Sequence, residues 1–208
     1  YDRFMNDTKK GGYGKLSLAD AFVKSSNVGI SKLVVEYYSK NPAQFVDRLY
    51  SMGLNEPLDI LISGESSPNI LHPKGNKSNW SGTTLPWMSI GYGIEMTPLQ
   101  ILSFYAAIAH DGKRMRPFFV KSIQENGKIE KEIKPQVINP SICSKTTIDI
   151  VKEMMLNVVE NGTAENLKND KYKIAGKTGT AQLLIEGIYS KQRHQSSFVG
   201  YFPANQPK

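Results

Sequence analysis

The stretch AGKTGTAQ, residues 175–182, combines one cation, two hydroxyl side chains and two glycines in an order that suits two different structures. The first is a phosphate-binding loop, because Gly176-Lys177-Thr178 matches the end of a G-x-x-x-x-G-K-[ST] motif. The opening glycine of that motif would be residue 171, which is a lysine. Gly179 and an apolar run follow, whereas a phosphate loop needs a helix N-terminus to hold the anion. A nucleotide-binding protein is therefore only a remote alternative.

The second structure is the Lys-Thr-Gly strand of serine acyl-transfer enzymes, which lies along the edge of a sheet. In this interpretation Lys177 supplies a fixed positive charge to a substrate carboxylate and to the nucleophile, and Thr178 and Thr180 offer hydroxyls to that carboxylate. Gly179 lets an extended peptide approach the backbone, and the N–H of Thr180 serves an oxyanion hole. An ordinary edge strand whose Lys and Thr side chains face water is the alternative for this motif taken alone.

A second polar element, Ser25-Ser26-Asn27, lies between two helical patterns. Ser17 is a plausible N-cap for the first helix, residues 18–23, and apolar positions spaced three and four apart continue through residues 30–37. A cluster of this kind often only caps a helix. It also fits an S-x-N element, in which Ser25 relays a proton and the amide of Asn27 holds the backbone of a substrate.

The remaining pattern predicts an α+β fold, with helices clustered against an antiparallel sheet. Further helices are expected over 42–52, where Asn41 is the cap, over 98–109, and over 144–159. Residues 118–123 and 129–133 alternate around Asn126-Gly127, a strong hairpin signal, and two more strands are expected over 172–182 and 198–202. Residues 58–84 form a long irregular connection. No linker composition divides the chain, so residues 1–208 are expected to belong to a single domain.

Composition excludes several classes of function. The 208 residues are 39% hydrophobic and 22% charged, as in ordinary globular proteins, and the net charge of +7 is spread without aromatic interleaving, which argues against nucleic-acid binding. Cys143 is the sole cysteine, so an intrachain disulfide is excluded. The three histidines are far apart and form no metal-binding motif, so no metal is expected. No apolar run is long enough to span a membrane.

The order of motifs along the chain resembles the transpeptidase domain of class B penicillin-binding proteins over nearly its whole length. After Ser25-Ser26-Asn27 come SIGYG at 89–93, TPLQ at 97–100, NGTA at 161–164, the Lys177-Thr178-Gly179 strand and FVGYFP at 198–203. The SSNVG and GYGI segments are most similar to the septal, division-specific type.

This resemblance implies a penicillin-binding, serine β-lactamase-like fold and a peptidoglycan D,D-transpeptidase that works through an acyl-serine intermediate. The implied partners are peptidoglycan stem peptides, β-lactams and cell-division proteins, with no cofactor and no nucleic acid. The implied location is the periplasmic side, at the outer face of the bacterial cytoplasmic membrane, reached through an N-terminal anchor absent from these residues. The implied catalytic residues are Ser25, Asn27 and Lys177, and the substrate-binding residues are Thr178, Gly179 and Thr180.

One element of the family pattern is missing. The nucleophile of these enzymes lies in an S-x-x-K motif, and no serine of this chain has a lysine three positions later. We therefore expect that the 208 residues are part of a domain that is incomplete at both ends, and that this part alone is inactive. A penicillin-recognising sensor or binding module remains the alternative, because sensor domains of this superfamily retain the nucleophile, and the residues that would decide between the two are absent from this chain.

Overall fold

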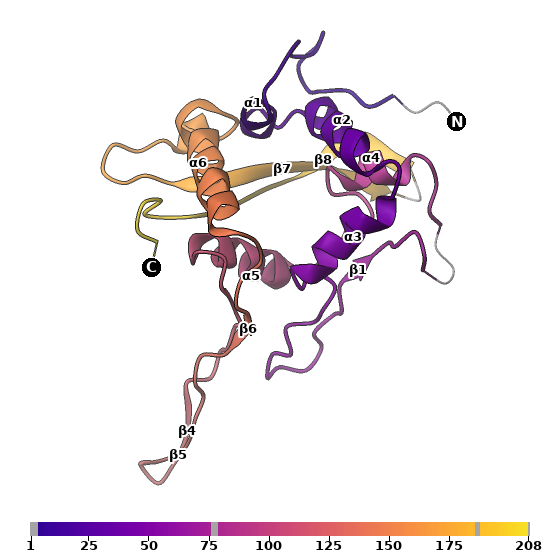
Figure 1. Ribbon diagram of the computed structural model, residues 1–208. Coiled ribbons are helices and arrows are strands. Elements are labelled where there is room, and N and C mark those ends of the chain that lie inside the picture. The colour runs from indigo at the N-terminus through magenta and orange to yellow at the C-terminus, as the bar shows by residue number, and fades with distance from the viewer. Residues whose placement is uncertain (1–3, 76–78, 186–187, 208) are drawn as a thin grey trace. The chain divides into compact units, whose positions relative to one another are not determined.

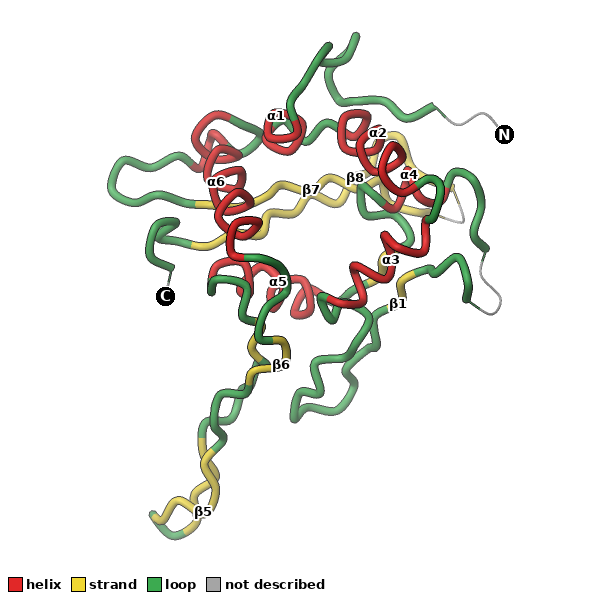
Figure 2. The backbone as a smooth tube through the Cα atoms, viewed as in Figure 1, coloured by secondary structure: helices red, strands yellow, loops and turns green. Residues whose placement is uncertain are grey.

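The computed structural model describes residues 4–75, 79–185 and 188–207 (Figure 1). These residues divide into two compact units, the first made of Tyr1–Lys32 and Asp149–Lys208 and the second of Leu33–Ile148. The single domain expected over residues 1–208 stays a prediction. Helices and antiparallel strands are mixed along the chain, so the α+β class is confirmed (Figure 2).

The first unit combines short helices with one long β-hairpin. Its elements are α1 (Leu18–Val23), the start of α2 (Asn27–Tyr38), most of α6 (Lys145–Asn161), the 3₁₀ turn η1 (Glu165–Leu167), β7 (Ala175–Ile185) and β8 (Ile188–Tyr201). The core joins α6 to α1, because Val158 and Val159 are fully buried and pack with Phe22 and Ile174. Burial of these side chains places the end of α1 beside the start of β7.

Both helices that flank Ser25-Ser26-Asn27 form where the pattern predicts them. Helix α1 begins with a capping box, in which the Ser17 side chain accepts from the N–H of Asp20 and the Asp20 carboxylate accepts from the N–H of Ser17. Helix α2 begins at Asn27. The intervening residues thus form a tight junction between two helices.

The β7–β8 hairpin is longer than the sequence pattern predicts. The two strands pair antiparallel from Ala175↔Tyr201 through Gln182↔His194. β7 covers Ala175–Ile185 where the pattern predicts 172–182, and β8 begins at Ile188 where the pattern predicts 198, so the predicted bounds of both strands are corrected. Backbone ladder bonds do not depend on the polarity of the side chains, so the exposed hairpin continues with polar residues on it.

Glycines let one aromatic ring lie across this hairpin. A Cβ at Gly176 would come within 2.3 Å of Cζ of Phe198, and one at Gly200 would come within 2.8 Å of Cε1 of the same ring. Phe198 is opposite Thr178 in the register, so its ring reaches diagonally over Gly176. The glycine of the Lys-Thr-Gly region that precedes the lysine is therefore a packing requirement.

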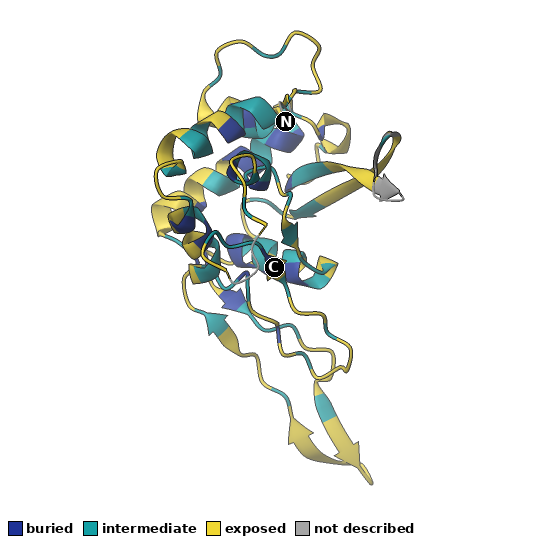
Figure 3. Ribbon diagram, turned by 90° about the vertical axis from the view of Figure 1, so that its right-hand side faces the viewer, coloured by how far each residue is buried: buried dark blue, intermediate teal, exposed yellow. Residues whose placement is uncertain are grey.

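The second unit contains the remaining helices and three two-stranded sheets, β1–β2, β3–β6 and β4–β5. Its elements are α3 (Pro42–Ser51), β1 (Asn69–Ile70), α4 (Thr84–Met88), β2 (Ile94–Glu95), α5 (Pro98–Ala109), β3 (Arg114–Met115), β4 (Ser122–Glu125), β5 (Lys128–Glu132) and β6 (Val137–Asn139). Its buried apolar residues include Val46, Leu54, Ile70 and Met88, and Figure 3 shows how burial is distributed over the elements.

Two predicted helices of this unit, α5 and α3, can be compared with the structure at their first residues. Helix α5 begins with a capping box between Thr97 and Gln100, and the Gln100 side chain, which is fully buried, also donates to the carbonyl of Ser66 at 3.0 Å. The TPLQ segment is thus explained by a helix start. Helix α3 has Asn41 at its N-cap and Pro42 in its first turn as predicted, but the Asn41 side chain makes no capping hydrogen bond.

The Asn126-Gly127 hairpin is confirmed. Both residues have positive φ, 50° and 80°, as a type I′ turn requires. Its strands are β4 and β5, and β4 begins only at Ser122, later than the predicted residue 118. Nearly every side chain of the hairpin is exposed. The alternation of apolar and polar residues here therefore accompanies strand pairing and not the burial of one face.

Candidate functional site

The junction between α1 and α2 holds Ser25 in an unusual backbone conformation. Its φ is 53°, in the left-handed region that residues with a Cβ seldom occupy. The N–H of Ser25 donates to the carbonyl of Phe22 at 3.1 Å, and the N–H of Ser26 donates to that of Ala21 at 2.8 Å. These two bonds close the end of α1 around Ser25.

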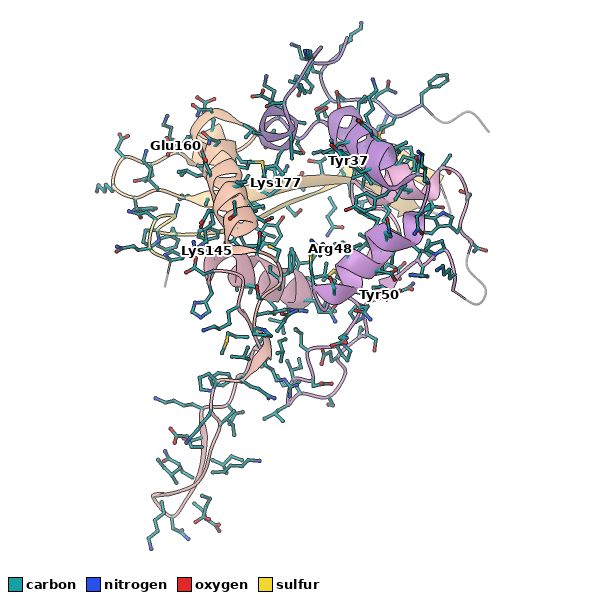
Figure 4. All side chains as sticks on the ribbon, viewed as in Figure 1. Tyr37, Arg48, Tyr50, Lys145, Glu160 and Lys177 are labelled. Atoms are coloured by element: carbon teal, nitrogen blue, oxygen red, sulfur yellow. The ribbon has the colours of Figure 1, made fainter. Side chains whose placement is uncertain are left out.

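Lys177 of β7 reaches this junction. Figure 4 labels the side chain of Lys177. Its ammonium group donates to Oγ of Ser25 at 2.8 Å and to the carbonyl of Thr178 at 3.1 Å, and it lies 5.6 Å from the centroid of the Phe22 ring. Burial lowers the pKa of Lys177 from 10.5 to about 8. The structure therefore joins the two predicted elements through one charge-assisted hydrogen bond.

Thr178 is held from a different element. Its Oγ1 lies 2.6 Å from Oγ1 of Thr163, which follows α6 in the NGTA segment. The N–H of Thr163 donates to the carbonyl of Val23 at 3.4 Å, and a Cβ at Gly162 would come within 2.7 Å of that same carbonyl. Gly162 thus permits the close approach through which the end of α6 reaches the end of α1.

The other predicted site residues differ in their surroundings. The amide of Asn27 donates to the carbonyl of Asn6 at 3.3 Å, and Thr180 is exposed on β7. A Cβ at Gly179 would lie 2.6 Å from Oγ of Ser197 on β8, so the glycine leaves room for that hydroxyl. The binding of substrate by Asn27, Thr180 and Gly179 stays a prediction.

Sequence reasoning missed the residues that support Ser25-Ser26-Asn27 from upstream. The Asp7 carboxylate accepts hydrogen bonds from Ser26 Oγ and from the N–H of Val28, each at 3.1 Å. No local spacing signals this contact, because about twenty residues separate the partners. Phe22 was placed in a helix, but its position beside Lys177 depends on the tertiary fold.

The phosphate-loop alternative is excluded by the backbone. Gly176, Lys177 and Thr178 lie in the first part of an extended strand that begins at Ala175 and continues to Ile185. The residues directly after Thr178 continue the strand instead of opening a helix, so their N–H groups do not converge on an anion as that motif requires. Among residues 4–75, 79–185 and 188–207, no group of three or more His, Cys, Asp or Glu side chains could hold a metal ion. In the same described residues no helix has both the length and the apolar character that a membrane span requires.

The second unit contains a polar cavity of about 530 Å³ that includes none of the predicted site residues. Arg114 lines it, is almost completely buried, and donates to the carbonyl of Gly53 at 2.6 Å and to Oγ of Ser103 at 3.2 Å. Arg116, also in the lining, pairs with the exposed carboxylate of Asp59 at 3.3 Å. These bonds tie β3 to the turn after α3.

The chain matches a known protein family and several of its members. Residues 1–208 match the penicillin binding protein transpeptidase domain. The chain is 34% identical over 197 residues to penicillin-binding protein PbpB of Mycolicibacterium smegmatis, which covers 90% of this chain and 29% of the relative. It is 29% identical over 198 residues to a probable peptidoglycan D,D-transpeptidase, PenA of Neisseria flavescens, covering 94% of this chain and 45% of that protein.

Solved structures of penicillin-binding proteins are also similar to this chain. Penicillin binding protein 3 from Mycobacterium tuberculosis, complexed with aztreonam, has a TM-score of 0.78 and 31% identity over 92% of this chain and 43% of that one. The transpeptidase domain of Burkholderia pseudomallei penicillin-binding protein 3 has a TM-score of 0.74 and 27% identity over 94% of this chain and 55% of that one. The chain thus spans less than half the length of the curated relatives named here. It belongs to the penicillin-binding protein transpeptidase family, of class B type.

Proposed function

We propose that the protein carrying this chain is a peptidoglycan D,D-transpeptidase that cross-links stem peptides through an acyl-serine intermediate and is acylated by β-lactams. The observation that supports this most directly is the 2.8 Å hydrogen bond from Lys177 to Ser25, made by the two elements that match the family motifs. The relatives named as D,D-transpeptidases and the related structure bound to aztreonam support the same reaction class.

The protonation of Lys177 suggests how the pair works. With a pKa of about 8 the side chain is mostly an ammonium ion at pH 7, so it donates to Ser25 and needs no proton from it. The hydroxyl proton of Ser25 is therefore available for transfer to a leaving group while its oxygen is held in place. This is the role of a proton relay beside a fixed positive charge.

The reaction itself needs a nucleophile that these residues do not contain, because no S-x-x-K motif occurs among them. In the proposed reaction that serine attacks the carbonyl of the penultimate D-alanine, the terminal D-alanine leaves with a proton, and an amine from a second stem peptide displaces the serine. Ser25, Asn27 and Lys177 would serve catalysis, and Thr178, Gly179 and Thr180 would bind the substrate along β7. The 208 residues alone would be inactive.

The likeness of the SSNVG and GYGI segments to the septal type supports a further part of the proposal. The complete protein would act with cell-division proteins at the outer face of the cytoplasmic membrane. Depletion of the protein in its host, followed by microscopy, tests this role: filaments that fail to divide support it, whereas rounded cells point to an elongation role.

The experiment that tests the enzymatic proposal is acylation by benzylpenicillin followed by mass spectrometry. The complete protein should gain one penicilloyl group, and the isolated 208 residues should gain none. A stoichiometric adduct on a serine of the isolated chain would show that the nucleophile has been misplaced. A complete protein that binds penicillin and is acylated, yet releases no D-alanine from a stem pentapeptide, would instead support a sensor or binding module.

A further inference from the structure

The carboxylate of Asp7 lies at the centre of a hydrogen-bond network around the Ser25-Ser26-Asn27 junction. The hydroxyl of Ser26 donates to it, with Oγ 3.1 Å from both carboxylate oxygens, and the N–H of Val28 donates to Oδ1 at 3.1 Å. Ser26 Oγ in turn accepts from the N–H of Gly29 at 3.0 Å. The network therefore satisfies two N–H groups of the first turn of α2 with one carboxylate and one hydroxyl.

Packing leaves this network little freedom. Ser26 is 1% exposed, so its hydroxyl would have no water to replace a lost acceptor. A Cβ at Gly29 would come within 2.9 Å of Cβ of Ala21 and 3.0 Å of Ser26 Oγ, so α2 starts in close contact with α1. Asn6, next to Asp7, accepts from the amide of Asn27 at 3.3 Å. The segment at residues 6–7 thus fixes both residues that follow Ser25.

The backbone of Ser25 requires such support. A residue with a Cβ at φ 53° is in a sparsely populated region, and it persists only where its surroundings enforce it. Residues 21–22 accept the N–H groups of Ser25 and Ser26 on one side, and Asp7 holds Ser26 and Val28 on the other. Without the carboxylate, the junction can relax toward ordinary helical angles, which would turn the Ser25 side chain away from Lys177.

We propose that Asp7 is a positioning residue, which holds the junction so that Oγ of Ser25 faces Nζ of Lys177. Asp7 acts through Ser26 and Val28 and makes no contact with the reacting groups. The inference rests on the proposed transpeptidase function. It assigns to the segment before α1 a part in catalysis that no motif in the sequence indicates.

The test compares the acylation of the complete protein and its Asp7→Asn variant by a fluorescent penicillin. Asparagine keeps the shape and loses the charge, so the bonds from Ser26 and Val28 weaken. The second-order acylation constant should fall about tenfold to a hundredfold, the range expected when a reacting group is displaced by about 1 Å. Asp7→Glu, which keeps the charge, should recover part of the rate.

The pH dependence of acylation distinguishes a positioning role of Asp7 from a purely structural one. Loss of the Ser25 acceptor disfavours the ammonium form of Lys177, so the alkaline limb of the acylation profile should move to lower pH in Asp7→Asn. Asp20→Asn is the matched control, because it removes a carboxylate that also accepts from a serine hydroxyl and a backbone N–H, in this case both of Ser17 at the start of α1. That control should keep its acylation constant within about twofold and its profile unchanged even where it lowers the melting temperature.

Each outcome decides between the alternatives. A wild-type protein that forms no adduct refutes the proposed function itself. A folded Asp7→Asn protein with the wild-type constant and profile refutes the positioning role while the function stands. If Asp7→Asn does not fold, Ser26→Ala removes only the hydroxyl that links Asp7 to Gly29. That variant should show the same loss of rate and the same shift, and a wild-type constant there would overturn the proposal.

Discussion

Nζ of Lys177 lies 2.8 Å from Oγ of Ser25 although 152 positions separate the two residues. Lys177 is near the start of strand β7, and Ser25 is at a left-handed junction between two helices. A buried core of α6 and α1 side chains holds the two elements side by side. The contact turns two short motifs, each of which is common by itself, into one polar site.

Replacement of Lys177 should remove most of the acylation activity of the complete protein. Lys177→Ala deletes the charged group that donates to Ser25, and we expect the acylation constant to fall about a hundredfold to a thousandfold, as for loss of a preorganised donor. Lys177→Arg should fall less, because it keeps the charge but changes the geometry. Stopped-flow measurements with a chromogenic cephalosporin check this. A Lys177→Ala protein with wild-type rates would contradict the assignment of the site.

Acylation should lose activity on the alkaline side of pH 8. Burial lowers the pKa of Lys177 to about 8, so above that pH the ammonium form and its hydrogen bond to Ser25 are lost. In Lys177→Arg this loss of activity should be absent up to about pH 10, because arginine stays protonated there. A limb at the same pH in both proteins would show that another group titrates.

The lowered pKa of Lys177 also makes the stability of the fold depend on pH. The unfolded chain holds the proton of Lys177 up to its ordinary value of 10.5, whereas the folded chain releases it near 8. The unfolded state therefore binds more protons between these two values, and the contribution of Lys177 to the free energy of unfolding should rise with pH across that window. Urea titrations at pH 7.5 and 10 give the free energy of unfolding of wild type and of Lys177→Met at both pH values. The change between the two pH values should be more positive in wild type, and the difference between the two proteins is the contribution of Lys177.

Gly176→Ala should destabilise the β7–β8 hairpin. The added methyl would come within 2.3 Å of Cζ of Phe198 and 2.7 Å of the carbonyl of Val199, so the ring or the backbone must shift. We expect the free energy of unfolding to fall by about 1–3 kcal/mol. Gly82→Ala is the control, because no atom lies within 4 Å of its added methyl, and its change should stay within about 0.5 kcal/mol. Equal changes in the two variants would contradict the packing of Phe198 over Gly176.

Arg114 and Arg116 offer a matched pair of charge deletions in the second unit. Arg114→Ala removes the donor to Ser103 Oγ and to the carbonyl of Gly53 and leaves a cavity, and should cost about 2–4 kcal/mol. Arg116→Ala breaks only the partly exposed pair with Asp59 and should cost less than about 1 kcal/mol. Thermal unfolding of both variants gives the comparison, and a larger loss for Arg116 would show that the exposed pair is the stronger support.

The sequence by itself determined the elements with strong local signals. Ser17 and Asp20 satisfy each other at the start of α1, Thr97 and Gln100 do so at the start of α5, and Asn126-Gly127 adopts its turn through positive φ angles. These features depend on atoms within three or four residues of one another, so pattern reasoning recovers them. The bounds of β7, the length of β8 and the absence of a side-chain capping bond at Asn41 were not predicted, because pairing and burial override local preference there.

The sequence also indicated which residues could form a site, because Ser25, Asn27 and Lys177 match motifs with a known chemistry. Only the tertiary structure decided which of them touch. Ser25 faces Lys177 because apolar burial of Phe22, Val158 and Ile174 brings α1 to β7, and no spacing along the chain encodes that approach. The same reason explains why Asp7 was missed: its partners are about twenty residues away, and a carboxylate in a polar segment has no signal until the fold supplies the hydroxyl and N–H groups that it binds.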